Sequence, residues 1–172
     1  MEANRTGIQT FLVDAFTNTA FSGNPAGVCL LDSPLPDNLM LQIAQEVNAS
    51  ETAFIGATDQ HGVFSIRYFS PKMEIPLCGH ATLASAKIVF ALRGVEEAHF
   101  INANGLRLSA RTRGESIEME FPIYETVPAD APPALLEALG IRSIHNVVYN
   151  PETSILLLEI AGTDTLAGLA PD

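Results

Sequence analysis

The sequence contains little positive charge, few cysteines and no long hydrophobic run. Nine lysine and arginine residues stand against 20 acidic residues, and a net charge of −11 leaves no basic patch for nucleic acid or for an anionic membrane surface. No apolar run reaches the roughly 18 residues of a membrane-spanning helix. The first residues, Met-Glu-Ala-Asn-Arg, do not resemble a signal peptide. We therefore expect a cytoplasmic protein without a nucleic-acid or membrane partner.

The two cysteines, Cys29 and Cys78, are too few for a disulfide framework. The spacing of cysteines and histidines matches no metal site, so we expect no bound metal. With 172 residues, 47% hydrophobic residues and a mean hydropathy of +0.21, the chain is long and apolar enough for one packed domain, or for one domain and part of another.

Residues 80–92 are predicted to form the helix around which the chain is organised. The segment is rich in alanine, contains no proline and is followed by Gly94, a typical helix stop. Lys87 is its only charged residue, so the helix has no polar face and must be surrounded by other elements. Because strand-like segments lie on both sides of it in sequence, we predict an α+β fold with a curled, mostly antiparallel sheet around one central helix.

The remaining elements follow from periodicity and turn residues. A loop at residues 21–27 and a helix ending near Asn48 are expected. Residues 1–121 are predicted to form a first domain, residues 122–133 a proline-containing linker, and residues 134–172 the beginning of an incomplete second domain. The predicted strands cover residues 8–13, 28–31, 63–68, 98–102, 106–112 and 116–121 in the first domain, with a short helix at 135–139 and a hairpin of 147–149 with 155–160 after it.

Two places in the first domain could carry chemistry. The helix start at Cys78-Gly79-His80 has no acidic residue, so its free amides and helix dipole could bind an anion. It could equally be an ordinary helix N-terminus, with His80 a structural histidine and Cys78 a core residue. Glu51 follows the helix that ends near Asn48 and precedes apolar sequence, so it is either a solvated carboxylate or a general acid/base.

Five stretches of the sequence together form a recognisable set. They are Val-Asp-Ala-Phe-Thr at 13–17, Phe-Ser-Gly-Asn-Pro-Ala-Gly-Val at 21–28, Ile-Ala-Gln-Glu-Val-Asn-Ala-Ser-Glu-Thr-Ala-Phe at 43–54, Ile-Arg-Tyr-Phe-Ser-Pro at 66–71 and Cys-Gly-His-Ala-Thr-Leu at 78–83. In this order they resemble the PhzF family of phenazine-biosynthesis isomerases. The resemblance implies a diaminopimelate-epimerase-like fold of two similar domains, an active site between them, and no cofactor. It also implies proton transfer between two carbons of a small carboxylic acid, of which hydroxylated cyclic acids are the best-known type.

The resemblance assigns roles to four residues. Glu51 matches the acid/base glutamate of the family, and Gly79, His80 and Ser50 are expected to bind the substrate carboxylate. Two alternatives stay open. One is a racemase or epimerase with two thiols, of which Cys78 would be the first. The other is a carboxylate-binding remnant without catalytic activity.

Family members carry a further acidic residue and a Thr-Gly-Ser-Ala stretch in their second domain, and neither occurs here. We therefore expect that the 172-residue chain folds its first domain but does not turn substrate over alone. Val147, Leu156 and Leu158 are expected to lack a full core, and exposed apolar surface of that kind favours a homodimer.

Overall fold

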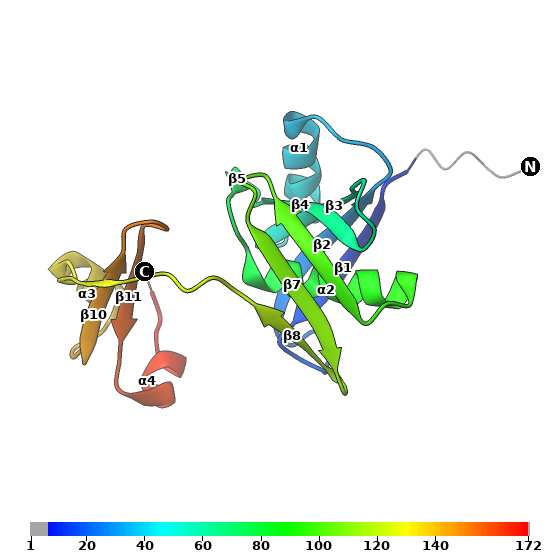
Figure 1. Ribbon diagram of the computed structural model, residues 1–172. Helices are drawn as coiled ribbons and strands as arrows, with labels where there is room; N and C mark the ends of the chain where they lie inside the picture. Colours follow the sequence, from blue (N-terminus) through cyan, green and yellow to red (C-terminus); the bar gives the residue numbers. More distant parts are fainter. Residues whose placement is uncertain (1–6, 172) are drawn as a thin grey trace, which may run out of the picture. The chain divides into compact units, whose positions relative to one another are not determined.

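The computed structural model describes residues 7–171 and divides the chain into two compact units, Met1–Phe121 and Pro122–Asp172 (Figure 1). The first unit contains two helices and a curled sheet in the order β1-β2-β3-β4-β6-β7-β8, with β5 paired to β4. Its elements are β1 (Gln9–Ala15), β2 (Asn24–Leu31), α1 (Asp37–Val47), β3 (Glu51–Ala57), β4 (Val63–Phe69), β5 (Glu74–Ile75), α2 (Gly79–Arg93), β6 (Glu97–Asn102), β7 (Arg107–Arg113) and β8 (Ser116–Glu120).

Two of the strand pairs are parallel, and a helix makes each crossover. β2 pairs parallel with β3 after α1, and β4 pairs parallel with β6 after α2, whereas the other pairs of this sheet are antiparallel. Parallel neighbours require a long connection, and a helix that packs on the sheet supplies it. α1 and α2 pack on opposite faces of the sheet (Figure 1).

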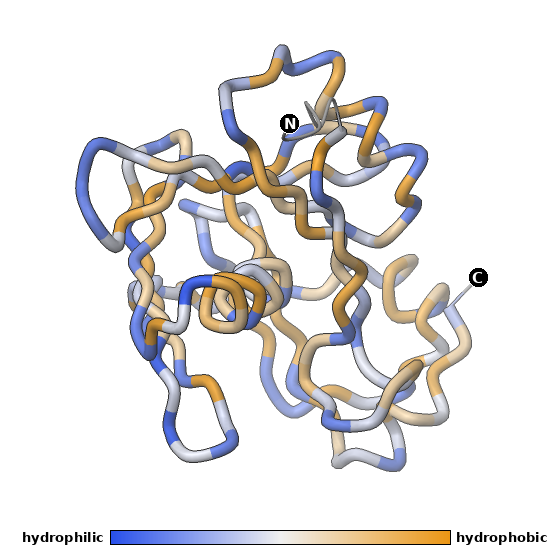
Figure 2. The backbone as a smooth tube through the Cα atoms, turned by 90° about the vertical axis from the view of Figure 1, so that its right-hand side faces the viewer, coloured by the Kyte–Doolittle hydropathy of each residue, from blue (hydrophilic) through white to orange (hydrophobic). Residues whose placement is uncertain are grey.

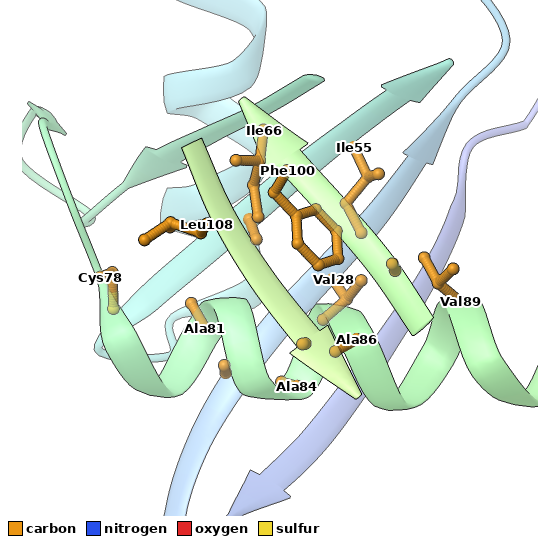
Figure 3. Close-up of a cluster of buried hydrophobic side chains, with 14 of the residues drawn as sticks. Val28, Ile55, Ile66, Cys78, Ala81, Ala84, Ala86, Val89, Phe100 and Leu108 are labelled. Carbon is orange, nitrogen blue, oxygen red and sulfur yellow. The ribbon is translucent and has the colours of Figure 1, made fainter. Parts of the chain in front are cut away.

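The predicted central helix is confirmed and extends one residue further at each end, as Gly79–Arg93. Its small buried side chains allow the strands to approach closely, and Figure 3 shows Val28, Ile55 and Phe100 of the sheet directed at the helix. Alanine is suited to this position because it favours helix and fills little space. The buried residues of α2 are His80, Ala81, Thr82, Ala84, Ser85, Ala86, Val89 and Phe90.

The sheet does not enclose α2 completely. Lys87 and Leu92 are exposed, and a groove between β1 and β8 is lined by α2 residues that include Leu83 and Lys87. The expectation of a fully surrounded helix is therefore wrong along this stripe. The single lysine of the helix lies there because its ammonium group keeps contact with water.

α1 covers the other face of the sheet. Met40 and Ala44 of the helix pack with Cys29, Phe54 and Phe69, and the two rings meet edge to face at 5.6 Å. The helix ends at Asn48, whose left-handed backbone (φ 51°) turns the chain into β3. Asparagine tolerates this conformation better than most residues.

The predicted loop at 21–27 is wrong in its second half. β2 begins at Asn24, which pairs with Ala15 of β1, and Pro25 and Gly27 lie inside the strand. Proline is accepted near the beginning of a strand, where fewer ladder hydrogen bonds are lost. Because the strand starts early, Asn24 and Pro25 lie beside the start of β3, where Ala26 pairs with Glu51.

The second unit contains a three-stranded sheet in the order β11-β10-β9. β9 lies within the predicted linker, so that segment is partly ordered as a strand. Val147 is buried and Leu156 and Leu158 are half-buried, and the exposed apolar residues of the hairpin are instead Ile155 and Leu157 on the opposite face. The elements are β9 (Val127–Pro128), α3 (Pro133–Leu139), β10 (Asn146–Asn150), β11 (Ile155–Glu159) and α4 (Gly162–Ala167).

Hydrophobic stretches are broken repeatedly by hydrophilic turns along the whole backbone (Figure 2). Among residues 7–171, no helix is both long and apolar enough to cross a membrane.

Candidate active site

Glu51 is placed by the alternation of strand β3. Ala53 and Ile55 belong to the cluster packed around α2, whereas Phe54 packs on the α1 side. Side chains two residues apart share a face of a strand, so Glu51 is directed toward α2. Its position as the first residue of β3 brings the carboxylate to the N-terminal end of that helix.

His80 lies in the first turn of α2 and meets the carboxylate directly. Nε2 of His80 is 3.3 Å from Oε2 of Glu51 and 3.2 Å from Oγ of Ser50. The His80 side chain is 10% exposed and that of Glu51 is 22% exposed, so the pair is largely shielded while the carboxylate still reaches solvent. The structure thus brings together Ser50, Glu51 and His80, which are separated by up to 30 residues in sequence.

Cys78 is the N-cap residue of α2 and contacts the other side of the imidazole. Its Sγ is 3.3 Å from Nδ1 of His80, and the residue is buried. Burial raises the pKa of the Cys78 thiol to about 11, a shift that the amide of Ala81 opposes and the negative charge of Glu51 increases. Cys78 therefore keeps its proton at neutral pH and is poorly suited to act as a thiolate.

The backbone amides at the N-terminus of α2 are the candidate anion site. No side chain of residues 7–171 caps the helix, and its first turn contains no acidic residue. The amides of His80 and Ala81 lie close enough to the Cys78 sulfur to lower its pKa, so the thiol already occupies part of this N-terminus. A Cβ atom at Gly79 would come no closer than 3.4 Å to the ring of Phe121, an ordinary contact, so packing does not require glycine there.

Two contributors to the site were not singled out from the sequence. Asn24 Oδ1 and the carbonyl oxygen of Pro25 both lie 3.4 Å from Oγ of Ser50. The Asn-Pro pair stands within one of the family-like stretches, but its turn-like composition favoured a loop. Pairing of β2 with β3 is what carries it to the site.

Oxygen, nitrogen and sulfur donors of Glu51, His80 and Cys78 all lie within 4.8 Å of one another, a donor set that zinc accepts. However, His80 directs Nδ1 to the thiol and Nε2 to the carboxylate, so one ion cannot replace both contacts as they stand. The geometry is that of a hydrogen-bonded chain. The expectation of no metal stays a prediction.

Cys29 is not a second thiol for this site. It is fully buried in the cluster between the sheet and α1, on the face opposite to Cys78. Both cysteines are free thiols. A two-thiol mechanism would thus need a thiol from outside residues 7–171.

A curled sheet around a helix, with ionisable groups at the helix N-terminus, defines a diaminopimelate-epimerase-like domain, as predicted. A solved structure described as a predicted epimerase from Pseudomonas aeruginosa shares this fold, with a TM-score of 0.70 at 23% identity over 96% of this chain and 64% of that one. A family model described as phenazine biosynthesis-like protein (PhzC-PhzF) matches residues 13–172. The chain belongs to this family, which confirms the resemblance seen in the sequence.

Similar proteins are longer than this chain. A phenazine biosynthesis-like domain-containing protein of Rattus norvegicus is 41% identical over 162 residues, covering 88% of this chain and 56% of the rat protein. A Pseudomonas aeruginosa protein named as an uncharacterized isomerase is also 41% identical, covering 94% of this chain and 61% of its own length. The crystal structure of a PhzF-family protein from Enterococcus faecalis has a TM-score of 0.80 at 34% identity, over 96% of this chain and 62% of that one.

Proposed function

We propose that the protein is a cofactor-independent isomerase that moves a proton between two carbons of a small carboxylic acid, with Glu51 as the base. The observation that carries this proposal is the contact of the Glu51 carboxylate with His80 at the uncapped N-terminus of α2. A base and an anion site then stand side by side, and removal of a proton next to a carboxylate needs both.

In this scheme Glu51 takes the proton from one carbon and returns it to another. The carboxylate is partly exposed, so a substrate can reach it, and its contact with Nε2 of His80 at 3.3 Å fixes its direction. A positioned general base contributes roughly 10²–10⁴-fold to such a reaction. Ser50, which shares the Nε2 contact, would hold either His80 or the substrate.

The substrate carboxylate would lie against the amide of Gly79. The helix dipole favours an anion at this end, and no acidic side chain of the first turn competes. The amides of His80 and Ala81 already face the thiol of Cys78. Of the amides at the helix start, that of Gly79 is therefore the one proposed to bind the substrate carboxylate, together with the hydrogen-bonding groups around it.

The names of relatives support the reaction class only. One relative from Pseudomonas aeruginosa and one from Halalkalibacterium halodurans are named as uncharacterized isomerases. Because the chain spans 56–64% of the length of the similar proteins described above, the reaction, a hydroxylated cyclic acid as substrate, and a homodimer are part of the proposal. A reducing, cytoplasmic location is also part of the proposal, because both cysteines are free thiols.

The proposal is tested by replacing Glu51 with Gln and measuring uptake of deuterium from D₂O into candidate carboxylic acids by NMR. The longest natural form of the protein is used, because substrate positioning would draw on groups of the whole protein. E51Q keeps the shape of the side chain but removes the base, so exchange should fall by about 10²-fold or more. The matched control is E46Q, at an exposed position of α1, which packs on the face of the sheet opposite to α2, and it should exchange like the wild type. Exchange in E51Q at the rate of E46Q would remove Glu51 from the mechanism.

A further inference from the structure

The hydrogen-bond partners of His80 determine which ring nitrogen carries the proton. Nε2 faces Glu51 Oε2 at 3.3 Å and Ser50 Oγ at 3.2 Å. An ionised carboxylate only accepts hydrogen bonds. The Ser50 hydroxyl can donate as well as accept, and the carbonyl oxygen of Pro25 and Oδ1 of Asn24, both at 3.4 Å, are further acceptors for its one hydrogen. The ionised carboxylate of Glu51 is therefore the neighbour that decides whether Nε2 carries a hydrogen.

A negative charge 3.3 Å from Nε2 stabilises a hydrogen on that nitrogen, so neutral His80 is protonated on Nε2. A neutral imidazole has one N–H, which leaves Nδ1 as an acceptor. The group beside Nδ1 is the thiol of Cys78 at 3.3 Å, within the distance of a hydrogen bond to sulfur. Since the pKa of this thiol is raised to about 11, it has a proton to donate at neutral pH.

The geometry points to Cys78 as a positioning residue: its S–H donates to Nδ1 of His80 and so holds the imidazole with its N–H on Nε2, beside Glu51 and Ser50. The contacts run from Cys78 through His80 to Glu51, and Ser50 joins them from the side. His80 then presents an N–H to the site and is not a second base. The tautomer is a property of the free protein, and only its consequence for catalysis rests on the proposed function.

The test is long-range ¹H–¹⁵N correlation NMR of the imidazole in the wild type, C78S and C78A. Spectra are recorded near pH 8.5, about two units above the ordinary imidazole pKa of about 6.5. The His80 signals are assigned by their loss in His80→Gln. We expect a protonated Nε2 and an unprotonated, hydrogen-bonded Nδ1 in the wild type. In C78S a hydroxyl replaces the thiol as donor and the pattern should persist. In C78A the Nδ1 resonance should move to the position of a nitrogen without a donor.

Two spectral outcomes would overturn the assignment. One is a protonated Nδ1 in the wild type, and the other is an Nδ1 resonance that is the same in C78A as in the wild type. If C78A does not fold, the wild-type and C78S spectra still decide the tautomer. The catalytic consequence is read separately by deuterium exchange, which should fall roughly tenfold in C78A, equivalent to one hydrogen bond, and stay near the wild-type rate in C78S. The expected spectra with unchanged exchange in C78A would confirm the tautomer and refute its role in the proposed reaction.

Discussion

Alanine at Gly79 should separate the function of this glycine from its contribution to stability. Gly79 is the first residue of α2, and its backbone is not in the left-handed conformation that favours glycine. An added methyl group would meet only the ring of Phe121, at 3.4 Å. Replacing glycine by alanine at a compatible position typically raises the free energy of unfolding by about 0.4–1 kcal/mol. G79A should therefore be as stable as the wild type or slightly more stable.

The same methyl group would stand where the substrate carboxylate is proposed to lie. Displacement of a substrate by about 1 Å can cost on the order of 10²-fold in rate, so G79A should lose turnover to that degree while it remains folded. Stability is measured by urea denaturation followed by circular dichroism, and turnover by deuterium exchange. Binding is followed separately through the amide resonance of residue 79 during titration with a carboxylic acid.

Gly27→Ala is the matched control, because there the packing does require glycine. Its Cβ would lie 2.6 Å from Oγ1 of Thr52 and 2.9 Å from Cγ1 of Val47, and Thr52 is fully buried beside Glu51. Overpacking of this kind costs about 1–3 kcal/mol. G27A should thus lose stability, whereas G79A should lose only function. A G79A variant with full turnover would refute the carboxylate site at the start of α2, and a destabilised G79A would refute the argument that packing does not require glycine there.

Two further predictions concern the groups beneath the site. Because the folded protein raises the pKa of the Cys78 thiol from 9.0 to about 11, its contribution to stability is complete below pH 9 and is lost as the pH rises toward about 11. Over that range urea denaturation should show a loss on the order of 2 kcal/mol in the wild type that is absent in C78S, and parallel curves would contradict the shift. Thr82 donates to the carbonyl oxygen of Cys78 at 2.7 Å, so the buried Tyr68 hydroxyl donates to Thr82 at 2.6 Å. Y68F should cost about 1 kcal/mol and T82V, which leaves that hydroxyl unpaired, about 1–3 kcal/mol, and the reverse order would refute this assignment of donors.

The central helix and most strands could be predicted because their signals are local. The alanine-rich segment without a polar face predicts an enclosed helix, and the alternation of residues 63–68 predicts strand β4. The loop assigned to residues 21–27 failed at Asn24 and Pro25, because long-range pairing with β1 and β3 outweighs their turn propensity. Strand β9 within residues 122–133 was not predicted, because its pairing partner β10 is distant in sequence.

The residues of the candidate site could be predicted from the sequence, but the contacts between them could not. Glu51 and His80 were identified through their motifs, and that they would meet depends on the packing of α2 against β3. That Cys78 and Glu51 take opposite nitrogens of one imidazole depends on side-chain geometry at the helix start. No sequence spacing encodes that geometry.

The parallel pairing of β4 with β6 has a consequence for the dynamics of the site. Glu51 lies at the start of β3, and α2, which carries His80, packs more extensively on β1, β2 and β3 than on β6, β7 and β8. Proteins open in cooperative segments with different free energies. Opening of β6–β8 would therefore expose one side of α2 while β1–β3 keep Glu51 and His80 in contact. Amide hydrogen exchange should then be faster in β6–β8 than in β1–β3, and this local opening would leave the Glu51–His80 pair intact.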